Sequence, residues 1–242
     1  MRPVSSDDLR RLRRERHTIG FGWGLAQADL DRLTGEWADR VAPDEHDVSE
    51  DFALVRPDGT PTGAVGPRWL FHLLGLAHRC SHVGLSTPNG LVVLQRRAST
   101  KVDWPDAWDM AVAGHVPHPM SFEEGAWKEI EEEIGLPEAE AAALLAEGRL
   151  LPVGEPYFCC DRILSRNPPF HNAEVRQVYA AALTPEGLAR LRPDYDELAG
   201  IHLCTVEEAW ALLESANVAS GLRHSLARYL DWLVRQRGAE AD

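Results

Sequence analysis

The stretch from Ser121 to Gly135 has the clearest periodic pattern of apolar positions in the chain. Ala126, Ile130 and Ile134 recur at every fourth residue, which places them on one face of a helix. Ser121 followed three residues later by a glutamate is a capping box, so the helix is predicted to begin there. Gly135 can adopt the left-handed conformation that ends a helix. We therefore expect a helix between these two residues that buries its apolar face.

Apolar runs elsewhere in the chain predict strands. Asn89-Gly90 is typical of a tight hairpin turn, and the apolar runs on both sides of it predict two antiparallel strands. Strands are expected at residues 82–86, 91–97, 110–113, 150–159, 175–183 and 199–204, and further helices at 137–147, 206–213 and 222–234. In the last helix Leu222, Leu226 and Leu230 form an apolar stripe.

Residues 1–65 are predicted to form a small N-terminal α+β extension to a main domain of residues 66–242. The extension opens with a basic helix whose arginines are Arg10, Arg11, Arg13, Arg14 and Arg16. A strand is expected at 18–25, a second helix at 28–38, and an acidic loop at 41–51. A solvated helix face explains the arginines more simply than a phosphate or partner site does.

The end of the 121–135 helix carries an unusual cluster of acids. Four of the five residues from Glu129 to Glu133 are acidic. Each carboxylate at a helix C-terminus costs roughly 0.3–1 kcal/mol, because that end of the helix is already partly negative. Glu129, Glu132 and Glu133 fall on one side of the helix, which suits a hard divalent cation such as Mg²⁺ or Mn²⁺. A solvated acidic face is the alternative, and spacing alone does not decide between the two.

The full pattern from Gly114 to Leu136 resembles the box of the Nudix (MutT-like) hydrolases. That box reads Gly-x5-Glu-x7-Arg-Glu, an apolar residue, any residue, Glu-Glu, any residue, Gly and an apolar residue. The positions that match it are Gly114, Glu129, Ile130, Glu132, Glu133, Gly135 and Leu136. Two positions depart from it: Met120 replaces the first glutamate, and Lys128 replaces the arginine. In the family these two side chains mainly brace the loop against the helix.

The resemblance implies a Nudix α/β/α sandwich, with a mixed sheet, the box helix on one face and C-terminal helices on the other. It implies that one to three Mg²⁺ ions (or Mn²⁺) are held by the Gly114 carbonyl and by Glu129, Glu132 and Glu133. The metals would bridge the oxygens of a small-molecule diphosphate substrate and activate water. Candidates for the catalytic base are Glu132, Glu133, Glu174 and Glu197. Candidates for substrate binding are Arg96, Arg97, Lys101 and Trp104, with Arg96 and Arg97 on opposite strand faces.

The flanking segments resemble two branches of that family. The strand Gln95-Arg96-Arg97, with Lys101 and Trp104-Pro105, is similar to the isopentenyl-diphosphate isomerase-like branch. Isomerisation depends on a cysteine where this chain has Ala113, so hydrolysis is favoured. A shorter similarity, around Val112 to Gly114, is to Nudix domains associated with thiamine pyrophosphokinase. The substrate is therefore expected to be a nucleoside diphosphate derivative, an isoprenoid diphosphate or a thiamine diphosphate-like molecule. A catalytically weak ligand-binding or regulatory protein is the alternative.

Composition and charge narrow the function further. A net charge of −13 argues against nonspecific binding to nucleic acid or to an anionic membrane. No apolar run approaches the ~20 residues of a membrane span, and the polar N-terminus lacks a signal-peptide core, so a cytoplasmic location is expected. The four cysteines show no disulfide framework or zinc spacing. His78, Cys80 and His82 alternate, so on a strand all three would share one face. A second metal site is conceivable there, but a partly buried polar strand face is the favoured interpretation. The oligomeric state stays open, with a homodimer as one option.

Overall fold

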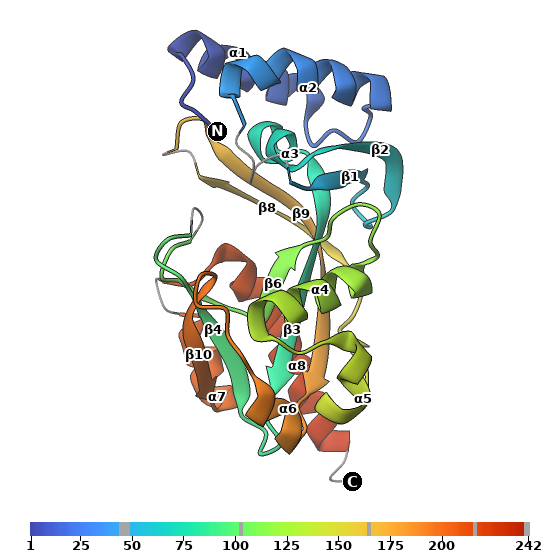
Figure 1. The fold of residues 1–242 in the computed structure, drawn as a ribbon, viewed down its shortest axis with the longest axis vertical. Coiled ribbons are helices and arrows are strands. Elements are labelled where there is room, and N and C mark those ends of the chain that lie inside the picture. Colours follow the sequence, from blue (N-terminus) through green and yellow to red (C-terminus); the bar gives the residue numbers. More distant parts are fainter. Residues whose placement is uncertain (44–48, 102–103, 164–165, 215–216, 240–242) are drawn as a thin grey trace. The chain divides into compact units, whose positions relative to one another are not determined.

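The structure is a computed structural model that describes residues 1–43, 49–101, 104–163, 166–214 and 217–239. The chain divides into two compact units (Figure 1). Unit 1 comprises Met1–Cys80, His115–Ser121 and Pro156–Arg176, and unit 2 comprises Ser81–Gly114, Phe122–Glu155 and Gln177–Asp242. Three strands contribute residues to both units: β3 (Ala77–Ser86), β6 (Val112–His115) and β9 (Phe170–Ala182). The mixed α/β class predicted from the sequence is confirmed.

Unit 2 contains most of the larger sheet and the box helix. Its strands include β4 (Val92–Arg97), β5 (Trp108–Asp109), β7 (Leu151–Pro152) and β10 (Leu198–Cys204). Its helices include α4 (Phe122–Ile134), a 3-10 turn η1 (Glu138–Glu140), α5 (Ala141–Leu144), α6 (Pro185–Arg190), α7 (Val206–Leu212) and α8 (Ser220–Ala239). The sheet has the order β10-β4-β3-β9-β7, with β5 paired to β4 and β6 paired to β3.

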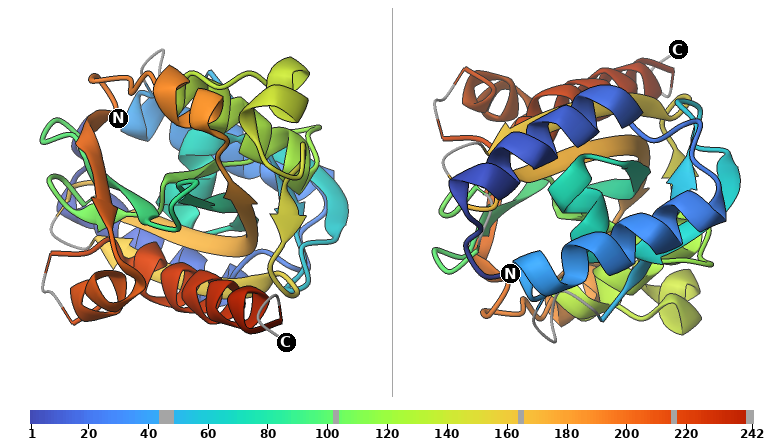
Figure 2. Two further views of the ribbon diagram at one scale, coloured as in Figure 1. Left: turned by 90° about the horizontal axis from the view of Figure 1, so that it is seen from below. Right: turned by 90° about the horizontal axis from the view of Figure 1, so that it is seen from above.

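Alternation along β3 explains the layers of unit 2. Val83 and Leu85 point to one face and pack in a core with Ala126 and Ile130 of α4. Gly84 points to the other face, where a Cβ atom would overlap the ring of Tyr229 of α8. Helices α4, α5 and α6 therefore cover one face of the sheet, and α8 covers the other with α7 packed beside it (Figure 2). This is the sandwich that the sequence predicts.

Unit 1 contains the N-terminal helices and a second, smaller sheet. Its elements include α1 (Ser6–Ile19), α2 (Gln27–Val41), β1 (Asp51–Val55), β2 (Pro61–Pro67), α3 (Arg68–Leu74) and β8 (Tyr157–Ile163). Strands β1 and β2 form an antiparallel hairpin, and β8 pairs antiparallel with the first part of β9. The apolar faces of α1, α2 and α3 share a core with β1, in which Leu12, Trp37, Phe52 and Phe71 are buried.

Several predicted elements differ from the observed ones. The strand expected at 18–25 is wrong, because α1 continues to Ile19 and residues 20–26 form turns and irregular structure. The helix expected at 137–147 is a 3-10 turn followed by the short helix α5. The strand expected at 110–113 lies two residues later, as β6. The acidic loop at 41–51 falls partly on residues 44–48, which lie outside the described residues. Its two ends belong to α2 and β1.

None of the helices in the described residues has the length and hydropathy of a membrane-spanning segment. The predicted division of the chain after residue 65 stays a prediction.

Candidate metal and diphosphate site

Helix α4 is held in place by its apolar stripe and by a glycine cap. Ala126, Ile130 and Ile134 are buried in the core of unit 2, as their spacing predicts. Gly135 follows with φ +71°, and its N–H donates to the carbonyl of Glu131 at 3.1 Å. The helix thus ends immediately after the acidic cluster, which fixes the cluster on its last two turns.

Two of the box acids lie against the end of strand β6. A Cβ atom on Gly114 would overlap the carboxylate of Glu129, so the glycine gives this side chain its place against the backbone. Glu133 is 5% exposed and accepts from the N–H of Ala113 at 3.4 Å. Within unit 2, Glu129 therefore lies against Gly114, whose carbonyl is the predicted ligand, and Glu133 contacts the residue before it.

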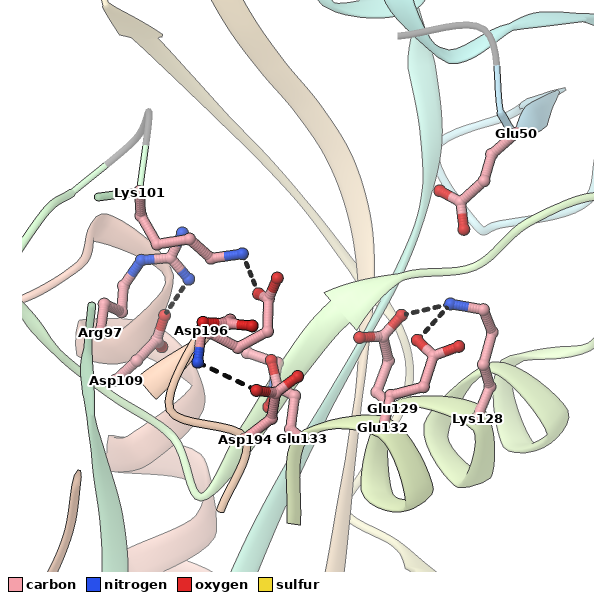
Figure 3. Close-up of polar contacts among 12 residues, drawn as sticks. Glu50, Arg97, Lys101, Asp109, Lys128, Glu129, Glu132, Glu133, Asp194 and Asp196 are labelled. Atoms are coloured by element: carbon pink, nitrogen blue, oxygen red, sulfur yellow. Dashed lines mark hydrogen bonds and ion pairs between the residues drawn. The ribbon is translucent and has the colours of Figure 1, made fainter. Parts of the chain in front are cut away.

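The third acid, Glu132, points toward solvent and is paired with a lysine. Its side chain is 56% exposed, and its carboxylate lies 2.7 Å from Nζ of Lys128. The same ammonium lies 3.2 Å from Glu129, so Lys128 stands between the two carboxylates (Figure 3). In the part of the chain that the structure describes, the close groups of potential metal ligands occur elsewhere. The three box acids thus share one end of α4, but only Glu129 and Glu133 lie together against β6.

The environment of Glu133 is short of positive charge. Burial raises the pKa of this carboxyl well above its usual range, and the neighbouring Glu129 and Asp109 raise it further. Arg97 acts in the opposite direction but does not cancel the shift. A buried carboxyl surrounded by carboxylates is the setting in which a divalent cation is most stabilising.

A second group of charged side chains lies on strand β4 and the segments beside it. The guanidinium of Arg97 is 3.6 Å from the carboxylate of Asp109, and both side chains are almost fully buried. Lys101 forms an ion pair with Glu197, whose backbone carbonyl accepts from the N–H of Ala98. Two of the predicted substrate ligands, Arg97 and Lys101, are therefore already engaged with partners of opposite charge, and so is the candidate base Glu197.

Arg96 and Trp104 have different surroundings from these residues. Arg96 is exposed on the opposite strand face from Arg97, where it lies over the ring of Trp108 and 3.8 Å from Asp106. Trp104 has φ +50° and accepts a turn hydrogen bond from the N–H of Ala107 at its carbonyl. The contacts described for these two residues give them no partner among the box acids.

Glu174 belongs to unit 1 and is deeply buried. Its carboxylate is 2.6 Å from the guanidinium of Arg176 and 3.2 Å from Nε2 of His115. Burial alone raises the pKa of a carboxyl, but Arg176 and His115 outweigh it and hold the pKa of Glu174 well below its usual range. The ionised form of Glu174 is therefore favoured, and both of its partners belong to unit 1.

Sequence reasoning did not identify Asp109 as part of this site. Its carboxylate accepts from the N–H of Met110 at 2.9 Å, and its strand β5 pairs with β4 in the register of Gln95. The signal that was available is an acidic residue inside a short run that is otherwise apolar. The ion pair of Asp109 with Arg97 forms because β5 pairs with β4, and this tertiary contact could not be read from the sequence.

Comparisons with known proteins agree on one family. A family model described as the NUDIX domain matches residues 78–229. Nudix hydrolase 3 of Arabidopsis thaliana is 34% identical over 90 residues, which are 37% of this chain and 12% of that protein. An uncharacterized Nudix hydrolase of Streptomyces coelicolor is 43% identical over 61 residues, which are 25% of this chain and 34% of that protein. The chain thus spans about a third or less of the length of these two curated relatives.

A solved structure agrees at the level of the fold. The crystal structure of a protein from Deinococcus radiodurans aligns with a TM-score of 0.54 at 18% identity. The alignment covers 74% of this chain and 98% of that one. At this identity the likeness concerns the fold alone.

Proposed function

Because this chain belongs to the NUDIX domain family, we propose that it hydrolyses the phosphoanhydride bond of a small organic diphosphate with the help of Mg²⁺ or Mn²⁺. The observation that carries the proposal is the position of Glu129 and Glu133 against the end of β6 at Gly114. Carboxylate and backbone carbonyl oxygens are the ligands that hard divalent cations prefer.

The residues present fit such a cation. Glu133 is buried beside Glu129, and its raised pKa reflects a lack of positive charge. The ammonium of Lys128 already occupies a cation position beside Glu129 and Glu132. Because this side chain is long and partly exposed, a metal ion would replace it there. Glu129, Glu132, Glu133 and the Gly114 carbonyl would hold the metal, which would neutralise negative charge on the diphosphate and lower the pKa of the attacking water.

The chain's own residues would position the substrate around that point. Arg97 and Lys101 are the proposed phosphate ligands, since a net charge of −13 requires local cations for an anionic substrate. Asp109 holds the Arg97 guanidinium in place, and Glu197 holds the Lys101 ammonium. When a phosphate replaces the carboxylate at Lys101, Glu197 becomes available as a base. Glu132 and Glu133 are the alternative bases within the box.

Glu174 stays a candidate base on the family's analogy. It is ionised, as a general base must be, but Arg176 and His115 occupy its oxygens. We therefore rank Glu197 above it.

The test is phosphate release from a panel of diphosphates with Mg²⁺ and Mn²⁺. The panel includes nucleoside diphosphate sugars, dinucleotides, isoprenoid diphosphates and thiamine diphosphate derivatives. Glu129→Gln and Glu132→Gln are expected to lower kcat at least about 100-fold, because each removes a carboxylate that would bind the metal. Glu131→Gln is the matched control, because Glu131 is an exposed acid on the same helix. Equal rates in all three variants would contradict the assignment of the site.

One observation favours a second candidate, a ligand-binding protein with little activity. Lys128 stands where the family has an arginine, and it pairs with two of the box acids. Saturable binding of a diphosphate without phosphate release would support this candidate. Isomerase activity is disfavoured by Ala113, and an allylic product formed without phosphate release would be needed to support it.

A further inference from the structure

Basic side chains from three elements of unit 1 come together beside Gly75. Arg16 lies in the last turn of α1, Arg162 lies on β8 and His171 lies on β9. Arg162 and His171 are directly opposite each other in the antiparallel pair β8–β9, so their side chains share one face of that pair. A Cβ atom on Gly75 would lie 3.1 Å from Nη2 of Arg16 and 3.4 Å from Cβ of His171. The guanidinium of Arg16 therefore reaches the same place as the imidazole.

Neither arginine of this group is neutralised by an acidic side chain in the part of the chain that the structure describes. Nε of Arg16 donates to the backbone carbonyl of Leu74 at 2.9 Å, which fixes the guanidinium and leaves its terminal nitrogens for another acceptor. Arg162 is exposed on the surface. Two unpaired guanidinium groups are unexpected in a chain of net charge −13, in which acidic side chains outnumber basic ones.

The imidazole of His171 is the buried part of the group. It is 2% exposed, and neither of its ring nitrogens has a hydrogen-bond partner among the described residues. Because buried polar atoms nearly always have partners, two unpaired nitrogens on one ring indicate that the ring serves a ligand. A neutral imidazole offers one N–H donor, and it offers two when a neighbouring anion favours its protonation.

The charges that the three side chains exert on one another are positive. Burial, followed by the charges of Arg16 and Arg162, lowers the pKa of His171 to about 3. Burial, followed by the charge of Arg162, lowers the pKa of Arg16 to about 10, and Cys160 acts in the opposite direction. The two guanidinium groups thus repel each other, and an oxyanion between them would turn this repulsion into attraction.

An aromatic cluster lies further along the same face of β8. Alternation along the strand places Phe158 on the face that carries Arg162. The ring centroid of Phe158 is 4.8 Å from that of Phe21 and 5.7 Å from that of Trp23. Trp23 is 42% exposed, so the cluster offers an aromatic surface to solvent. Such a surface can stack on the ring of a small molecule.

We propose that Arg16, Arg162 and His171 form a binding site for a phosphate group. Guanidinium groups match the oxygens of a phosphate, and their charge-assisted hydrogen bonds are stronger than those between neutral groups. The phosphate enters at the exposed Arg162, and the flexible arginine side chains bring it to the buried imidazole. Two sources share this chemistry: inorganic phosphate, and a phosphate monoester whose ring stacks on the aromatic cluster. The site shares no residue with the box.

The experiment observes the imidazole of His171 by nuclear magnetic resonance in the full-length, metal-free protein. Protein labelled in its histidine rings is titrated with sodium phosphate at constant pH, and the assigned ring signals of His171 are recorded. We expect a saturable change in these signals. A parallel titration with sodium chloride to the same ionic strength is expected to produce little change, because chloride offers no set of oxygens to the guanidinium groups.

Variants test the two arginines. Arg16→Gln and Arg162→Gln are each expected to weaken the affinity for phosphate at least about 10-fold, because each removes charge-assisted hydrogen bonds. Arg13→Gln is the matched control, since Arg13 is an exposed arginine of the same helix as Arg16. Arg97→Gln, which changes a proposed substrate ligand, is also expected to keep wild-type phosphate affinity at His171. Far-ultraviolet circular dichroism checks that each variant is folded. If Arg16→Gln fails to fold, Arg162→Gln provides the test, because Arg162 is exposed.

A comparison of two probes distinguishes the sources of the phosphate. Adenosine monophosphate that binds at least about 10-fold more tightly than inorganic phosphate, with the difference lost in Trp23→Ala, would identify a phosphate monoester with an aromatic ring. Equal affinities of the two probes would identify inorganic phosphate.

Two results would overturn the proposal. The first is a response of the His171 signals to sodium phosphate that is no larger than their response to sodium chloride. The second is wild-type affinity for phosphate in folded Arg162→Gln. Neither result depends on hydrolysis, so the proposed function is tested separately.

Discussion

Gly114 shows how a single missing side chain shapes the candidate site. The carboxylate of Glu129 fills the volume that any Cβ at this position would occupy. Since Glu129 is a long side chain, it could rotate away from a new methyl group, but it would then leave the end of β6. Glycine is therefore needed at this position to make room for a carboxylate, and not to allow a backbone turn.

Gly114→Ala is expected to lower kcat by about 10-fold or more while leaving the fold intact, because a misplaced metal ligand affects rate more than stability. The measurement is phosphate release at saturating Mg²⁺, with thermal unfolding recorded in parallel. A variant with wild-type kcat would show that Glu129 does not need its present position.

At the scale of elements, β3 separates the two faces of the unit 2 sheet. Its alternate residues face α4 and α8, and Gly84 lets the Tyr229 ring of α8 approach the strand closely. This contact connects the C-terminal helix to the same strand that supports the box helix.

Gly84→Ala is expected to destabilise the protein by about 1–3 kcal/mol, because the new methyl group overlaps the Tyr229 ring in a packed layer. Gly35→Ala is the matched control, since a Cβ there meets no atom within 4 Å and Gly35 lies inside α2. That control is expected to stabilise the protein by about 0.5–1 kcal/mol. Urea unfolding measures both, and equal stability of the two variants would contradict the packing described.

Local signals account for the elements that the sequence predicted well. The box helix has a capping residue, a period of four and a terminal glycine, and it is observed from Phe122 to Ile134. The hairpin β1–β2 was missed, although Pro57-Asp58-Gly59 is a strong turn signal and Gly59 has φ +82°. The strand expected at 18–25 is absent because α1 uses Ile19 in its last turn.

The candidate site was less predictable than the box helix. Spacing placed Glu132 with Glu129 and Glu133, but helix geometry does not say which carboxylate is buried. Pairing of Glu132 with Lys128, of Arg97 with Asp109, and of Lys101 with Glu197 depends on tertiary contacts. His72 of α3, His78 of β3 and His115 of β6 have ring nitrogens within 4.8 Å of one another, and no local sequence pattern contains all three.

At the scale of the whole molecule, the buried histidines predict loss of stability in acid. His78 and His171 have pKa values of about 3 in the folded protein because burial disfavours their charged form, and the pKa of His72 is also lowered by burial. In the unfolded chain they take up protons below the ordinary value of 6.5. The unfolded state therefore binds more protons, and stability falls as pH decreases below 6.5.

Each such histidine is expected to remove up to about 1.4 kcal/mol of stability per pH unit below its unfolded pKa. The measurement is urea unfolding of the metal-free protein at about pH 7.5 and about pH 5.5. His72→Asn is expected to reduce the dependence of the free energy of unfolding on pH by the contribution of one histidine. Stability that does not change between the two pH values would contradict the neutral, buried state of these rings.

Lys128 gives the acidic end of α4 a resident cation of its own. Under the proposed function, loading a metal there is an exchange of one positive group for another rather than simple filling of a vacant place. The measured metal affinity then reports the difference between the binding free energies of the metal ion and of the Lys128 ammonium. It is therefore weaker than the affinity that the carboxylates would have without the lysine. In return, the helix tolerates periods without metal, since its neighbouring negative charges are never left entirely to repel one another.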